Sequence, residues 1–125
     1  MLAGVDIAVT GSAIVSGDRE MLQVVIQNIL MNAAQAMGGK GRIDVIVTDH
    51  GADCRIDVID QGPGMPPEVR EKAFEAFYTT KHRGTGLGLP IARRVIEGHK
   101  GKIEIQVPPT GGTVVSITLP IAFRN

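Results

Sequence analysis

The residues with the clearest chemical potential form a glycine-rich stretch, GTGLGL at residues 84–89, which an amphipathic segment follows. Alternating glycines before a helix describe a loop in which the backbone can approach a ligand closely, because glycine has no β-carbon. The free amides at the start of a helix, together with its macrodipole, favour an anion such as phosphate. The stretch therefore predicts a phosphate-binding loop.

A second glycine-rich element, DQGPG at residues 60–64, lies earlier in the chain between an alternating segment and a proline-started segment. Taken alone, it is typical of an ordinary turn. Its first residue, Asp60, would end a buried strand, and a carboxylate in that position is costly unless it has polar partners. Asp60 is therefore also a candidate ligand contact.

Two asparagines, Asn28 and Asn32, stand four residues apart in a segment with helical apolar spacing, and Gln35 follows on the same face. Asparagine is a poor residue for the middle of a helix, so its repetition there needs a reason. One interpretation is a polar contact with a neighbouring helix or loop. The other is an amide oxygen that ligates Mg²⁺, a cation that prefers hard oxygen donors.

Three further groups have a structural interpretation, and for one of them a functional interpretation stands beside it. Phe74, Phe77 and Tyr78 fit the packing of a short helix. The polar segment 81–83 (KHR) is either a solvated loop or a cationic partner for a triphosphate. The segment 111–113 (GGT) most simply makes a turn between two strands.

Other kinds of site are excluded by their spacing. The glycines do not match the Rossmann pattern, and neither Gly-Lys pair lies in a Walker loop. No nucleophile elbow supports hydrolase chemistry. The three histidines, His50, His82 and His99, lack metal-ligand spacing, and the lone cysteine, Cys54, lies in a strand-like segment.

Composition sets the remaining bounds. A chain of 125 residues is long enough for one domain with a two-layer core. The 13 basic and 13 acidic residues balance, which gives no electrostatic case for binding nucleic acid or an anionic membrane. A single cysteine fits a reducing compartment, and no apolar segment is long enough for a membrane span. We expect a cytoplasmic domain.

The elements that must position these residues follow from periodicity and turn signals. We expect a hairpin over residues 5–16, a helix from Asp18 to Gly38, and a short helix from Pro66 to Ala76. A polar loop should cover residues 78–83, and a helix with Ile91, Val95 and Ile96 inward should run from about residue 87 to 99. Alternation predicts strands over residues 42–48, 54–60, 102–107 and 113–119. The order ββαββααββ predicts a two-layer α/β sandwich, with helices on one face of a mixed, mostly antiparallel sheet.

This series of motifs resembles the ATP-binding catalytic domain of sensor histidine kinases, most closely the short-lid kinases similar to nitrogen-regulation sensors. Their superfamily has the Bergerat fold and includes gyrase and heat-shock chaperone ATPases. The resemblance covers residues 5–121 and implies that residues 1–125 form one catalytic domain, separate from its sensor and phosphoacceptor domains. It implies that Asn32 ligates Mg²⁺, that Asp60 accepts a hydrogen bond from the adenine amine, and that Lys81 lies near the phosphates. The other nucleotide contacts that it implies are Gly62, Gly64, Arg83, Gly84, Thr85, Gly86, Leu87, Gly88, Leu89 and Thr113.

The same resemblance bears on the type of reaction. Asn28 occupies the position where gyrase-like relatives carry a glutamate that activates water, and an asparagine cannot act as a general base. Transfer of the γ-phosphoryl group to a histidine needs mainly positioning and charge neutralisation, for which Asn28 and Lys81 are the catalytic candidates. The expected partners are a dimerisation domain with the acceptor histidine and, indirectly, a response regulator. The alternative is an anti-sigma-type serine kinase or a nucleotide-gated partner-switching module.

Two positions depart from the family pattern. Ala36 replaces an aromatic residue that many relatives place near the adenine, and Gln35 replaces a lysine seen in others.

Overall fold

The computed structural model describes residues 4–15, 17–62 and 88–121. Its elements in chain order are β1 (Val5–Thr10), α1 (Arg19–Ala36), β2 (Gly41–Asp49), β3 (Asp53–Asp60), α3 (Gly88–Gly98), β4 (Lys102–Gln106) and β5 (Thr113–Pro120). The short helix and the polar loop expected over residues 66–76 and 78–83 lie outside the described residues. Within the described ranges, no helix combines the length and apolar character needed to cross a bilayer.

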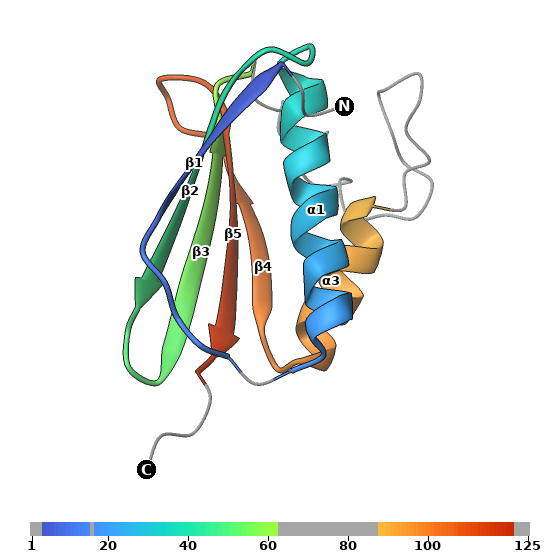
Figure 1. Cartoon of the computed structure of the whole chain (residues 1–125), viewed down its shortest axis with the longest axis vertical. Helices are drawn as coiled ribbons and strands as arrows, with labels where there is room; N and C mark the ends of the chain where they lie inside the picture. The colour runs from blue at the N-terminus through green and yellow to red at the C-terminus, as the bar shows by residue number, and fades with distance from the viewer. Residues whose placement is uncertain (1–3, 16, 63–87, 122–125) are drawn as a thin grey trace.

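The strands form one sheet in the order β1-β2-β3-β5-β4. The β1–β2 pair is parallel, and the other three pairs are antiparallel. Figure 1 shows α1 and α3 side by side on the same face of this sheet. The predicted two-layer α/β sandwich with a mostly antiparallel sheet is therefore confirmed.

The longest helix, α1, begins and ends where the sequence predicts. The Oδ1 atom of Asp18 accepts a hydrogen bond from the backbone N–H of Met21 at 3.1 Å, which caps the helix. Gly38 and Gly39 have positive φ angles of 69° and 80° at its end, where glycine is favoured. Between these ends, Val25, Ile29 and Ala33 recur every four residues and are buried against the sheet.

The hairpin expected over residues 5–16 is wrong. β1 pairs with β2 instead, with Ile7 opposite Ile43, and α1 is the crossover that parallel strands require. After β1 the chain passes Gly11, which packs so closely on β2 that a β-carbon added to it would lie 2.0 Å from the carbonyl oxygen of Val47. The chain then approaches the C-terminal segment, where Val15 forms an isolated antiparallel bridge with Ile121.

The core lies between the sheet and the helix pair. Its fully buried members include Ile43, Val58 and Ile117 from the strands and Ala92 and Ile96 from α3. The inward position expected for Ile91 is wrong, because Ala92 and Ile96 define the buried stripe of α3 and Ile91 is 43% exposed.

The other face of the sheet is polar. Ion pairs join residues two apart on the same strand, at Arg42–Asp44, Arg55–Asp57 and Lys102–Glu104. These positions alternate with the buried residues of β2, β3 and β4, as the pleat of a strand requires. No described helix covers this face (Figure 1).

Candidate functional site

Two buried polar residues meet at one end of the sheet. Asp60 is the last residue of β3 and Thr113 the first of β5, and the two face each other in the strand register. Only 5% of Asp60 and 4% of Thr113 is exposed. The Oδ1 atom of Asp60 accepts a hydrogen bond from the backbone N–H of Gly62 at 2.9 Å, which fixes the carboxylate and the turn after it. The fold thus places two of the expected nucleotide contacts opposite each other at this end of the sheet.

The backbone around this pair is closely packed. An added β-carbon at Gly112 would lie 2.4 Å from the carbonyl oxygen of Asp60, and Gly112 has a positive φ of 80°. Both facts exclude a larger residue there. The glycine-rich turn before Thr113 is therefore required by the structure of this end of the sheet, whether or not a ligand is bound.

The C-terminal part of α1 forms the neighbouring wall. Asn28 and Asn32 are half-buried and directly precede the buried residues Ile29 and Ala33, so they lie along the edge of the buried stripe. At the end of the helix, an added β-carbon on Gly62 would lie 3.0 Å from the carbonyl oxygen of Ala36. This close approach brings the asparagine-bearing helix and the Asp60 turn together.

A hollow of about 470 Å³ opens beside this contact. Its lining residues come from the end of α1, the turn into β2 and the turn after β3: Ala36, Met37, Lys40, Gly41, Gln61 and Gly62. The Sδ atom of Met37 accepts a hydrogen bond from the backbone N–H of Gln61 at 3.4 Å. The small side chain of Ala36 leaves this wall open at the position where the family pattern has an aromatic residue.

Sequence reasoning missed Met37 and Gln61 as residues of this region. Gln61 lies inside the glycine-rich element of residues 60–64, although only its aspartate and glycines were named as candidates. Met37 directly precedes the two glycines that end the helix, and that position is the one sequence signal for it.

The structure brings only part of the predicted site together. Asn28, Asn32, Asp60, Gly62 and Thr113 lie at one end of the sheet and along α1, and α1 contacts both β3 and α3. Gly88 begins α3, and Leu89 packs against the hydrophobic core. The remaining predicted contacts lie outside the described residues: Gly64, Lys81, Arg83, Gly84, Thr85, Gly86 and Leu87.

Residues 17–122 match the family model of histidine kinase-, DNA gyrase B- and HSP90-like ATPases. The chain belongs to this family. Among curated relatives of this ATPase domain, sporulation kinase A of Bacillus subtilis is 37% identical over 109 residues, which cover 87% of this chain. The sensory histidine kinase/phosphatase NtrB of Salmonella typhimurium is 42% identical over 115 residues, which cover 83% of this chain. The matches span only 18% and 33% of the lengths of these two proteins.

Solved structures give the same result for the fold of the ATPase domain. The catalytic domain of histidine kinase ThkA in a nucleotide-free form superposes with a TM-score of 0.84 at 35% identity, covering 94% of this chain and 80% of that one. Full-length ShkA in complex with AMPPNP superposes with a TM-score of 0.82 at 28% identity, covering 97% and 26% of the two chains. The chain is therefore a catalytic domain of the histidine-kinase type, and the resemblance to nitrogen-regulation kinases is confirmed.

Proposed function

We propose that this domain binds ATP with Mg²⁺ and transfers the γ-phosphoryl group to a histidine on a separate dimerisation domain. The observation that carries the proposal is the buried Asp60–Thr113 pair at the end of the sheet, next to the asparagine-bearing helix. A buried carboxylate held by a backbone amide is suited to accept a hydrogen bond from an exocyclic amine such as that of adenine. Bound AMPPNP in full-length ShkA supports an adenine nucleotide as the ligand.

The residues of α1 fit the metal as well as the nucleotide. Asn32 supplies an amide oxygen, a hard donor that Mg²⁺ accepts beside waters and substrate phosphates. When bound, Mg²⁺ would neutralise charge on the phosphate groups that move during transfer. Asn28 lies one turn before Asn32 on the same helix and would orient the phosphates by hydrogen bonding, since its amide cannot remove a proton from water.

The reaction would follow from this division of roles. A ring nitrogen of the acceptor histidine forms the new bond to the γ-phosphorus atom, while the bond from that phosphorus to the bridging oxygen of ADP breaks. The domain itself would hold the adenine at Asp60 and Thr113 and the triphosphate near the start of α3, where the backbone amides of a helix favour anions. Lys81 and Arg83 would add positive charge beside the phosphates.

The test is phosphoryl transfer between separate domains. The chain is incubated with γ-labelled ATP, Mg²⁺ and the dimerisation domain of its parent kinase, and Asn32→Ala and Asp57→Asn variants are run in parallel. We expect label on the dimerisation domain that is lost in acid and kept in alkali, as a phosphoramidate is. Asn32→Ala should abolish the transfer, and Asp57→Asn, on the outer face of the sheet, should not.

Other outcomes would contradict the proposal in recognisable ways. An alkali-labile phosphoserine on a partner would favour the anti-sigma-type alternative. Rapid ATP hydrolysis by the chain alone would indicate a general base elsewhere in the domain. Failure of the unmodified chain to bind ATP at all would overturn both the nucleotide site and the transfer reaction.

A further inference from the structure

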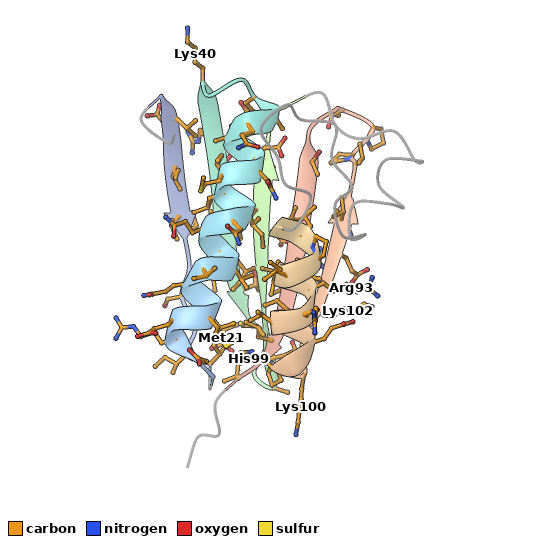
Figure 2. The ribbon with its side chains drawn as sticks, turned by 90° about the vertical axis from the view of Figure 1, so that its right-hand side faces the viewer. Met21, Lys40, Arg93, His99, Lys100 and Lys102 are labelled. Atoms are coloured by element: carbon orange, nitrogen blue, oxygen red, sulfur yellow. The ribbon has the colours of Figure 1, made fainter. Side chains whose placement is uncertain are left out.

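His99 connects the end of one helix to the beginning of the other. It follows the last residue of α3, and its Nε2 atom lies 2.9 Å from the backbone nitrogen of Asp18, which caps α1. Its Nδ1 atom lies 2.8 Å from the carbonyl oxygen of Val95. Figure 2 shows His99 and Met21 near each other at the lower end of the helix pair, opposite the end where Lys40 lies.

The two contacts define the chemical state of the imidazole. The backbone nitrogen of Asp18 can only donate, so Nε2 must carry a lone pair and accept. The proton of the neutral ring is then on Nδ1, which donates to Val95. His99 therefore holds one residue of α3 and one residue of α1 at the same time, and it can do so in one tautomer only.

The surroundings leave the ring little freedom. An added β-carbon at Gly17 would lie 2.3 Å from Cδ2 and 2.7 Å from Nε2 of His99, so residue 17 has no room for a side chain. The backbone N–H of His99 donates to the carbonyl oxygens of Val95 and Ile96 at the end of α3. The contact with Asp18 thus joins two rigidly capped helix ends.

The helices that His99 joins carry the two walls of the nucleotide site. Asn28 and Asn32 belong to α1, and α3 begins at Gly88, within the glycine-rich stretch of residues 84–89. The two helices contact each other, and the core that they share with the sheet includes the small buried side chains of Ala33, Ala34 and Ala92. Apolar packing is non-directional, whereas a hydrogen bond between the helix ends holds two defined residues at a set distance and angle.

We propose that His99 is a positioning residue for the nucleotide site. Its bond to Asp18 holds α1 and α3 in one axial and rotational position, so that the asparagines and the start of α3 face the same ligand. The inference rests on the proposed function, because nucleotide affinity is one of its two readouts. Its other readout is independent of any ligand.

The experiment uses two substitutions that separate the two hydrogen bonds. In His99→Gln, an amide oxygen can lie at the distance of Nε2 and still accept from Asp18. In His99→Asn, the shorter side chain reaches only the position of Nδ1, so the bond to Asp18 is lost. A third variant, Gly17→Ala, displaces the imidazole while His99 itself is unchanged. Ser116→Ala is the control, because it removes a hydrogen bond to Asp57 on the opposite face of the sheet.

We expect His99→Asn and Gly17→Ala to weaken binding of a Mg²⁺-loaded, non-hydrolysable ATP analogue by roughly 3- to 30-fold in calorimetric titration. His99→Gln and Ser116→Ala should bind as the unmodified chain does. All titrations are made well below the melting temperature of each variant, so that lost stability alone does not lower the affinity. Equal affinities for His99→Asn and the unmodified chain, or failure of His99→Gln to restore affinity, would overturn the proposal.

The ligand-free readout keeps the proposal separate from the function. In heteronuclear NMR spectra of the free domain, His99→Asn should shift the backbone amide signals of Asn32 and Leu89, which lie far from residue 99 along their helices. Shifts confined to the neighbourhood of residues 18 and 99 would overturn the positioning role even if ATP binds. If the unmodified chain binds no nucleotide but the distant shifts occur, the proposed function fails and the helix positioning stands.

Discussion

Two aspartates on one strand show how residue position decides chemical role. Asp57 and Asp60 both belong to β3, but they are three positions apart, so their side chains lie on opposite faces of the sheet. The Oδ1 atom of Asp57 accepts from Ser116 at 2.6 Å and from Arg55 at 2.8 Å, on the polar face of the sheet. The hydrogen bond from Arg55 to Asp57 raises the pKa of the Arg55 guanidinium above its usual value. Asp60 ends the strand on the helix side, where it is buried and accepts from the backbone N–H of Gly62.

At this scale we predict that Asp60→Asn weakens ATP binding by about 1–3 kcal/mol, the usual effect of a mismatched buried polar partner. The asparagine oxygen can keep the bond from Gly62, which turns its NH₂ group toward the adenine amine, so that two donors face each other. GTP binding should change far less. Calorimetric titration of both nucleotides measures the difference, with Asp57→Asn as the matched control. Equal losses for ATP and GTP would contradict an adenine contact at Asp60.

At the scale of elements, α1 and α3 end in the same backbone motif with different residues. In α1, the N–H groups of Gly38 and Gly39 donate to the carbonyl oxygens of Gln35 and Ala34. In α3, the N–H groups of Lys100 and Gly101 donate to those of Glu97 and Ile96 in the same pattern. Gly38 and Lys100 occupy the equivalent left-handed position, with φ angles of 69° and 62°. Only the lysine carries a β-carbon there, which costs conformational energy.

Exchanging these residue types should therefore change stability in opposite directions. Lys100→Gly should raise the free energy of unfolding by about 0.5–1 kcal/mol, since relief of the left-handed strain exceeds the added entropy of the unfolded chain. Gly38→Lys should lower it by about 1 kcal/mol. No atom lies within 4 Å of an added β-carbon at Gly38, so this effect belongs to the backbone alone. Urea denaturation measures both, and a destabilised Lys100→Gly would contradict the assignment.

At the scale of the whole molecule, the domain has one core beneath one layer of described helices. Cys54 lies in that core and is 1% exposed. Burial is the main reason that the pKa of its thiol is raised above the usual 9.0. The thiol is thus protonated and inaccessible unless the sheet and helices separate, so its reactivity reports the opening of the whole domain.

We predict that Cys54 in the native chain reacts with a neutral disulfide reagent at least about 1,000-fold more slowly than in guanidinium. A Cys54→Ala, Lys40→Cys double variant should react at the unprotected rate, because residue 40 is exposed. Equal labelling rates for native Cys54 and the exposed cysteine would contradict the burial.

The raised pKa of Cys54 also affects stability, because the folded thiol binds its proton more tightly than the unfolded one. The contribution of this thiol to the free energy of unfolding is therefore full below about pH 9.0 and is lost as the pH rises further.

The sequence by itself determined the described elements whose signals are local. Asp18 and the two glycines after Met37 mark the ends of α1, and alternation marks β2, β3, β4 and β5 within one or two residues of their observed ends. These signals are readable because capping, positive φ and strand alternation depend on residues within a turn or two of each other. Asp60 was singled out from the sequence as a carboxylate that would end a buried strand, and its burial at the end of β3 agrees with that. Thr113 was expected at the nucleotide site only from the resemblance to the family.

Only the tertiary structure decided which distant segments meet. The partner of β1 is β2 and not the segment after Gly11, because the strand reaches a parallel neighbour across α1. The same holds for the contact of His99 with Asp18, 81 residues apart, and for the opposition of Asp60 and Thr113 across two strands. Such contacts depend on how the buried faces of the helices and the sheet fit together, and no local residue pattern encodes that fit.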